Sequence, residues 1–283
     1  MLSIAHPRVS RGRRTRRIAA STLVLLLAGA AVASAHDMFA KPARFFVDEN
    51  AEVLVRILNG TFSKSENSIA RARVRNVSVV SPDGRRQLDT AQWSAEGDTS
   101  AFRVTAGAAG TYVIGASTTA NVIALEAKDF NLYLREDGIP DVLEARRRSG
   151  ELDRPARERY SKHVKALVQV GRARSDHFGT ELGYPAELVP LDNPYALPAG
   201  RVLRVRTLVD GSPAAAQFVL YGGRTPGGNR IAQRSVRSDT AGVARVPLRA
   251  PGTWYVKFIN MSRVQGDTVD YESKWATLTF QVK

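Results

Sequence analysis

Short segments in which apolar and polar residues alternate, each closed by a turn signal, fill much of the chain. Glu52–Leu58 alternates and stops at Asn59-Gly60, and Val74–Val80 is followed by Ser81-Pro82-Asp83-Gly84. Alternation with a period of two buries one side of a strand, and Pro, Asn, Asp and Gly favour the turns between strands. Several strands at this spacing are typical of antiparallel β-sandwiches. The pattern therefore predicts a mainly all-β protein.

Two stretches interrupt this pattern. Residues 124–162 mix isolated Leu, Ile and Val with many acids and arginines, and they predict a helical insertion. Residues 187–200 contain Pro190, Pro194 and Pro198, and such proline density favours an extended connector. We therefore expect a β-sandwich at 36–186 that carries the insertion, a linker at 187–200, and a second β-sandwich at 201–283.

The second sandwich carries a recognisable order of turns. A strand ends at Asp210-Gly211-Ser212-Pro213, a turn follows at Ser238–Gly242, and Pro251-Gly252-Thr253 opens the strand that begins with Trp254. This order resembles transthyretin-like (prealbumin-like) modules. The resemblance implies an immunoglobulin-like sandwich that serves as a spacer or a binding unit.

Residues 1–35 have the pattern of a signal peptide. Six arginines precede the apolar segment Ile18–Val32, and Ala33-Ser34-Ala35 offers small residues for cleavage. The apolar segment is shorter than the roughly 20 residues that a membrane-spanning helix needs. The pattern predicts export to the periplasm and cleavage before His36, while the Sec and twin-arginine routes both stay open.

Charge and cysteine content exclude several classes of function. Without the six arginines of residues 1–35, the formal net charge falls from +14 to +8, and the remaining Lys and Arg lie dispersed among acids. No basic block with interleaved aromatic residues predicts binding to nucleic acid, although weak attraction to an anionic envelope surface fits this charge. The chain has no cysteine, which removes thiolate metal sites, thiol catalysis and disulfides.

A mature chain that begins with His36 would carry a free α-amine and an imidazole on one residue. Both are nitrogen ligands for a transition metal, and the amine loses its proton easily because its pKa is about 7.7–8.0. A second histidine would complete a histidine brace, and the candidates are His163 and His177. The alternatives are a solvated chain terminus at His36, a solvated helix end at His163 and a plain loop position at His177.

Acidic side chains are the remaining candidate ligands. Asp37 follows the terminal histidine directly, and Glu272 lies in the acidic cluster Asp267–Glu272 before the final strand. The rim of a hairpin explains that cluster equally well. The chain contains no nucleophile elbow, phosphate-binding loop, zinc-protease motif or dinucleotide fingerprint, and we expect no catalytic activity. An oxidative copper enzyme is the alternative, because polysaccharide monooxygenases also pair a terminal histidine with a β-sandwich.

Six motifs along the mature chain resemble exported bacterial proteins that form the periplasmic component of nickel/cobalt uptake systems, the NikK-type family with a domain of unknown function. The motifs are A-H-D-M-F at 35–39, R-I-L-N-G-T-F at 56–62, K-A-L-V-Q-V-G at 165–171, L-G-Y-P-A-E-L-V-P-L-D-N-P at 182–194, S-D-T-A-G-V-A at 238–244 and Y-E-S-K-W-A-T-L-T-F at 271–280.

The resemblance implies binding of nickel or cobalt at His36 and delivery to an inner-membrane metal transporter, or receipt from an outer-membrane receptor. Ligand chemistry favours copper, because the affinity of nitrogen sites rises toward Cu²⁺. Two other functions stay open from the residues alone. One is a copper carrier, and the other is a structural or adhesive β module without a metal.

Overall fold

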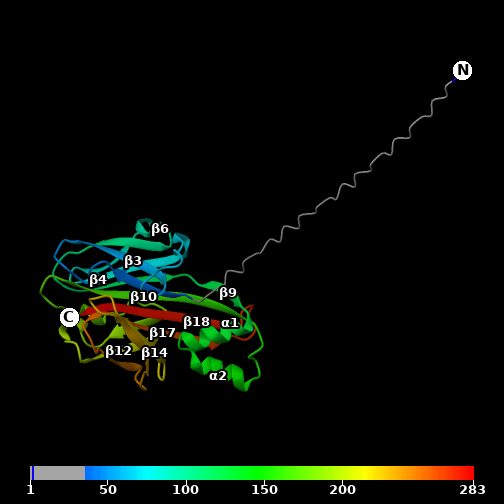
Figure 1. Ribbon diagram of the computed structural model, residues 1–283. Helices are drawn as coiled ribbons and strands as arrows, with labels where there is room; N and C mark the ends of the chain where they lie inside the picture. The colour runs from blue at the N-terminus through cyan, green and yellow to red at the C-terminus, as the bar shows by residue number, and fades with distance from the viewer. Residues whose placement is uncertain (1, 3–35) are drawn as a thin grey trace. The chain divides into compact units, whose positions relative to one another are not determined.

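The computed structural model describes Leu2 and residues 36–283, so nearly all of the predicted signal peptide lies outside the described residues. Residues 36–283 form three layers of β-sheet (Figure 1). A ten-stranded sheet lies in the middle, and a four-stranded sheet packs on each of its faces. The prediction of a mainly β, sandwich-like fold is confirmed.

The strands of each sheet come from distant parts of the chain. The first four-stranded sheet has the order β1 (Asp37–Pro42), β3 (Glu52–Gly60), β7 (Thr99–Thr105), β6 (Ser94–Glu96). The ten-stranded sheet has the order β15 (Arg230–Arg237), β14 (Phe218–Arg224), β17 (Gly252–Arg263), β18 (Tyr271–Val282), β10 (Ala156–Val170), β8 (Gly110–Thr118), β4 (Val74–Ser81), β5 (Gly84–Leu88), while β2 (Phe46–Val47) and β9 (Asn121–Leu125) also pair with β10. The third sheet contains β11 (Ala186–Pro190), β12 (Val202–Val209), β13 (Ser212–Pro213) and β16 (Val243–Pro247).

Strand β10 is the centre of the molecule because it belongs to both cores. Its even-numbered residues from Val164 to Val170 pack into the core beneath the first sheet. Leu167, on the opposite face, packs into the core between the ten-stranded sheet and the third sheet. Residues on successive positions of a strand point to opposite faces, so a strand covered on both sides needs apolar residues at nearly every position. This explains why five of the seven residues at 164–170 are apolar; the other two, Lys165 and Gln169, are buried against the polar partners Glu187 and Thr111.

The two helices cover one end of the middle layer. Helix α1 (Ala127–Glu136) and helix α2 (Pro140–Arg148) follow β9, and α1 buries Phe130, Tyr133 and Leu134 against Trp275 and neighbouring residues. The helical insertion predicted at 124–162 is therefore too long. Residues 156–162 form the start of β10, because they pair with both β9 and β18 and this pairing outweighs their helix propensity.

Strand β1 lies at the edge of the first sheet, yet the carbonyls of its outer edge are hydrogen-bonded. Thr277 Oγ1 donates to the Met38 carbonyl at 2.8 Å, and Thr279 Oγ1 donates to the Ala40 carbonyl. Lys162 Nζ donates to the carbonyl of His36, one step further toward the N-terminus. Side chains of β10 and β18 thus satisfy an edge that a neighbouring strand would otherwise occupy.

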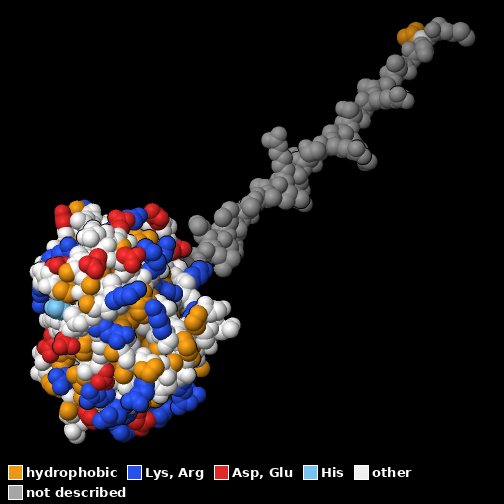
Figure 2. Space-filling view, turned by 90° about the vertical axis from the view of Figure 1, so that its left-hand side faces the viewer, with side chains coloured by type: hydrophobic (Ala, Val, Ile, Leu, Met, Phe, Trp, Pro, Cys, Tyr) orange, Lys and Arg blue, Asp and Glu red, His pale blue; other side chains and the backbone are white. Residues whose placement is uncertain are grey.

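Three observations bear on the expectations from the sequence. The ten-stranded sheet contains strands from both sides of residues 187–200, and the two-domain division there stays a prediction. Lys and Arg side chains are scattered among acidic and hydrophobic ones on the face shown in Figure 2. Within residue 2 and residues 36–283, no helix is both long and apolar enough to cross a membrane.

The close approach of β14 and β17 depends on a glycine. A Cβ atom at Gly223 would lie 2.2 Å from the Thr253 carbonyl oxygen, a backbone atom that cannot move alone. We expect Gly223→Ala to lower the free energy of unfolding by about 1–3 kcal/mol, measured by urea denaturation. Gly227→Ala in the same hairpin is the control, because the nearest atom to its Cβ is 4.0 Å away. Equal effects of the two substitutions would contradict this explanation.

Candidate functional site

His36 stands where the first sheet, the middle sheet and the helices meet. It lines a cavity of about 500 Å³ together with residues of β14, β15, β17 and α1. It also lines a small cavity of about 60 Å³, whose other walls include Glu158, Lys162 and Trp275. Strand β1 begins at the next residue, and Met38 and Phe39 are fully buried. The structure therefore holds His36 in place.

A tight loop after β3 brings a carboxylate to the His36 imidazole. The His36 Nδ1 atom lies 3.2 Å from Glu66 Oε2. The loop closes through hydrogen bonds from the Glu66 N–H to the Asn59 carbonyl (2.9 Å) and from the Asn59 N–H to Ser65 Oγ (3.0 Å). Gly60 permits the turn, because a Cβ there would lie 2.6 Å from the Lys64 carbonyl oxygen. The position of Glu66 thus follows from the N-G pair that ends β3.

A buried lysine joins two carboxylates beside His36. Lys257 Nζ on β17 lies 2.5 Å from Asp37 Oδ2 and 3.0 Å from Asp137 Oδ1, at the end of α1. Burial raises the pKa of Asp137 to about 6, although Lys257 acts in the opposite direction. Burial lowers the pKa of Lys257, but Asp37 and Asp137 outweigh it and hold this pKa above its ordinary value. The other oxygen of Asp37, Oδ1, is buried and has no hydrogen-bond partner within residues 36–283.

The small cavity contains a second buried lysine. Lys162 Nζ donates to Asn59 Oδ1 at 3.0 Å and to the His36 carbonyl, and it lies 5.1 Å from the centre of the Trp275 ring. Burial lowers the pKa of Lys162 to about 8, although nearby Asp37 acts in the opposite direction. Burial also raises the pKa of Glu158, which accepts a hydrogen bond from Tyr133 Oη at 3.0 Å. Isolated buried charges are costly, so this concentration of ionisable groups marks a candidate functional site.

The predicted ligands separate into two groups. His36 and Asp37 lie together at the site. His163 does not join them: it follows Lys162 on β10 and faces the other side of the sheet, where Nδ1 lies 2.9 Å from Ser117 Oγ and Nε2 lies 3.1 Å from Ser161 Oγ. His163 is buried within the core, which differs from the solvated helix end considered above. It makes two hydroxyl contacts and serves as a packed core residue.

His177 and Glu272 also lie elsewhere. His177 is half-buried in the short helical turn Asp176–Gly179, where its Nδ1 lies 2.9 Å from Ser175 Oγ. Glu272 is on β18, where it is half-buried, while Tyr271, Ser273 and Trp275 on the alternate positions are buried. Since alternate residues face opposite sides, Glu272 points away from the small cavity. Neither residue lines a cavity that His36 lines.

Side-chain ligands alone do not form a metal site in this part of the chain. Within Leu2 and residues 36–283, no three His, Asp or Glu side chains lie close enough together to hold a metal ion. The pair that does lie together is His36 Nδ1 and Glu66 Oε2. A third donor at this place is the α-amine of His36, which becomes free only when the preceding residue is removed. The donor set of amine, imidazole and carboxylate fits a divalent transition metal.

Sequence reasoning missed Glu66, Asp137, Lys162 and Lys257. Lys162 lies in the polar first half of β10 and had no signal, whereas Lys257 had one, because it interrupts the otherwise apolar segment 254–259. A lone charge at such a position predicts a buried charge with a partner. Asp137 and Glu66 had no comparable signal, since each lies in a polar loop or at a helix end.

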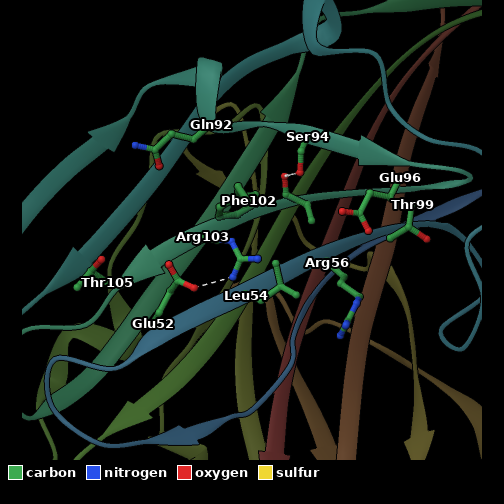
Figure 3. Close-up of a pocket in the computed structure, with 11 residues that line it drawn as sticks. Glu52, Leu54, Arg56, Gln92, Ser94, Glu96, Thr99, Phe102, Arg103 and Thr105 are labelled. Carbon is green, nitrogen blue, oxygen red and sulfur yellow. Dashed lines mark hydrogen bonds and ion pairs between the residues drawn. The ribbon is translucent and has the colours of Figure 1, made fainter.

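A second depression lies on the outer face of the first sheet (Figure 3). It has a volume of about 770 Å³, and its walls are side chains of β3, β6 and β7, with Arg103 Nη1 2.6 Å from Glu52 Oε1. Both members of this ion pair are more than half exposed. The depression contains no histidine and none of the buried charges, which makes the His36 region the better candidate.

A family model covers most of the chain and matches residues 33–262. The chain belongs to the family described as "Domain of unknown function (DUF4198)". The matched segment includes His36, Glu66, Asp137, Lys162 and Lys257. This description names no activity, so the nickel/cobalt role and the transthyretin-like module stay proposals.

Comparison with other proteins adds little. No curated protein matches the chain. Among solved structures, "Biofilm associated protein - BSP domain" shows 9% identity and a TM-score of 0.20, with 86% of this chain and 29% of that chain covered. "Crystal structure of tetra-tandem repeat in extending region of large adhesion protein" shows 10% identity and a TM-score of 0.23, with 86% and 48% covered. The chain thus spans less than half the length of these two structures.

The buried state of His163 predicts a pH-dependent stability. Burial, with Arg75 and Lys274 nearby, lowers the pKa of His163 from 6.5 to about 3. Between about pH 3 and pH 6.5, His163 is therefore protonated in the unfolded chain and neutral in the folded chain. The free energy of unfolding falls as the pH falls through that range. Between pH 7 and pH 5 we expect a loss of about 2 kcal/mol from His163.

Urea denaturation at both pH values tests this expectation. His163→Gln removes the titrating group, and the difference in unfolding free energy between pH 7 and pH 5 should shrink by about 2 kcal/mol. His177→Gln is the control and should leave the difference unchanged. The same pH dependence in His163→Gln and the native protein would show that His163 is not the group responsible.

The ion group of Lys257, Asp37 and Asp137 predicts a second effect. Lys257→Met leaves two buried carboxylates without their cation, so we expect a loss of about 3 kcal/mol of unfolding free energy at pH 7. The loss should be smaller at pH 5, because protonated carboxyl groups no longer repel each other. Lys274→Met is the control: its partner Asp210 is 62% exposed, and such a pair contributes about 1 kcal/mol or less. A Lys257→Met loss as small as the control's would contradict the assignment.

Proposed function

We propose that the exported protein, after cleavage before His36, is a periplasmic carrier that binds a divalent transition-metal ion at its N-terminus. The observation that supports this most directly is the fixed position of His36. A terminal residue is ordinarily frayed, but here the next residue is already part of β1 and the His36 carbonyl accepts a hydrogen bond from the buried Lys162. A fixed terminal histidine has its two nitrogens organised before the metal arrives.

The proposed ligands are the α-amine and Nδ1 of His36 together with Glu66. The amine and Nδ1 of one residue close a six-membered ring with the metal. Glu66 Oε2 is 3.2 Å from Nδ1. Two ligands that each lie about 2 Å from one ion are separated by about this distance. Asp37 is a neighbouring acid that pairs with Lys257 through Oδ2, while its Oδ1 has no hydrogen-bond partner among residues 36–283 and is a further acceptor beside the site.

We place nickel or cobalt first on the family resemblance and copper second on ligand type. The proposed ligands are two nitrogens and one oxygen, a set that binds Cu²⁺ more tightly than Ni²⁺ or Co²⁺ when all are supplied equally. Selection of nickel or cobalt would therefore depend on supply and on the shape of the surrounding cavity. The role proposed is binding and transfer, with an inner-membrane metal transporter or an outer-membrane receptor as the partner.

A structural or adhesive β module is the competing function. Such a module has no use for a fixed terminal histidine with a carboxylate at Nδ1 or for the buried ions around it. The two functions differ in one inexpensive measurement. The carrier should melt at a higher temperature when Ni²⁺ or Cu²⁺ is added and return to its original melting temperature with a chelator, whereas the module should show no change.

The proposal predicts that metal binding depends on processing. The chain starting at His36 should bind Ni²⁺ or Cu²⁺ at least about 100-fold more tightly than the same chain with five alanines added before His36. The addition converts the His36 amine to an amide and places the new α-amine too far along the chain to chelate together with the His36 imidazole. Isothermal titration with each metal measures the difference. Glu66→Gln in the processed chain should weaken binding about 10-fold or more, and His177→Gln should have no effect.

Equal affinity of the processed and extended chains would refute the proposal. Intact-mass measurement of the protein recovered from the periplasm tests the preceding step. A mature mass that corresponds to any start other than His36 would remove the terminal chelate altogether.

A further inference from the structure

The larger cavity beside His36 offers more room than a metal ion needs. It has a volume of about 500 Å³. An ion with six waters of about 30 Å³ each fills about 180 Å³. The remaining volume is lined by residues other than the proposed metal ligands. Those walls therefore indicate what accompanies the metal.

The hairpin of β14 and β15 contributes positive charge and hydrogen-bond donors. Arg224 and Arg230 both line the cavity, together with Gln233. Arg224 Nε donates to Ser63 Oγ and its Nη1 donates to the Gly228 carbonyl at 2.7 Å, which holds this side chain in place. A site for a bare cation has no use for guanidinium groups, because they repel it.

Arg230 is available for a ligand. Its side chain makes no hydrogen bond or ion pair with any of residues 36–283 and is exposed at the start of β15. Gln233 Oε1 accepts a hydrogen bond from Tyr255 Oη at 2.9 Å, which leaves the amide NH₂ of Gln233 as a further donor at the cavity. A guanidinium and an amide in one wall suit a carboxylate, which guanidinium groups bind in a bidentate manner.

Three aromatic rings complete the cavity. Phe39, Phe62 and Tyr255 contact one another with ring centres 4.9–5.3 Å apart, and all three line the cavity. They come from β1, the loop after β3, and β17. Together they give the cavity an apolar surface, which is suited to the carbon skeleton of a small organic molecule.

We propose that this cavity binds the metal as a complex with a small chelator that bears carboxylates, such as a polycarboxylate or an amino acid. The metal lies at His36 and Glu66, and a carboxylate of the chelator pairs with Arg230. This inference rests on the proposed function and adds the chemical class of the cargo. The charges of the cavity support this inference. The metal cation would meet the acidic residues that line it, and the carboxylates of the chelator would meet the arginines.

Equilibrium dialysis with ⁶³Ni²⁺ and ¹⁴C-citrate, each alone and as a 1:1 mixture, tests the inference on the processed protein. A parallel set uses ¹⁴C-labelled L-histidine as the chelator. We expect the protein to retain nickel and one chelator in equal amounts from at least one mixture, and to retain neither chelator without nickel. Arg230→Gln should weaken retention of that chelator about tenfold and change the affinity for nickel alone by less than twofold.

Arg234→Gln is the matched control, because Arg234 is exposed on the same strand and does not line the cavity. Retention of nickel with neither chelator would overturn the inference and leave the proposed function standing. So would equal effects of Arg230→Gln and Arg234→Gln. Loss of nickel binding in every arm, or chelator-dependent binding that is unchanged by five alanines before His36, would instead refute the proposed function.

Discussion

The outer edge of β1 is the constraint on which the candidate site depends. Three successive outward carbonyls of this segment, those of His36, Met38 and Ala40, accept hydrogen bonds from side chains of β10 and β18. A neighbouring strand would cover the edge of β1 along its whole length. Single side chains bond its carbonyls and still leave part of this edge open to solvent. His36 is therefore both anchored and accessible, with its side chain 20% exposed. A fixed yet reachable side chain is the property that a chelating residue needs.

Burying the ionic groups near His36 costs desolvation free energy, which apolar burial in the two cores offsets. Lys162 and Lys257 are each more than 90% buried, and each replaces an apolar residue that would pack without desolvation. The two cores that share β10 supply the compensating burial, since most of the strand's residues from Val164 onward lie inside one core or the other. The ionic groups near His36 lie at the end of the middle sheet, where the helices and β1 meet it, and a further buried ion pair, Lys165 with Glu187, lies between β10 and β11.

The sequence predicted the elements well because alternation and turn residues act locally. The strand predicted at 52–58 forms most of β3, which ends at Gly60 of the Asn59-Gly60 turn signal, and the alternating segment 74–80 lies within β4. It predicted the site poorly because the site is assembled from segments far apart in the chain. Asp37 and Lys257 are 220 positions apart, and no local pattern links them. His163 illustrates the same limit: its rarity as a residue type made it a candidate ligand, while its strand phase, which turns it away from Lys162 and His36, becomes decisive only once the sheet is known.

The contact between Thr277 and Met38 joins residues that are 239 positions apart. The position of His36 therefore depends on β18, the last strand of the chain. A partly synthesised chain has the residues of β1 but lacks β18, so His36 has no support against which to lie. Contacts between such distant segments also form late, because closing a long loop is entropically costly. His36 therefore acquires its fixed position only after the far end of the sheet has folded.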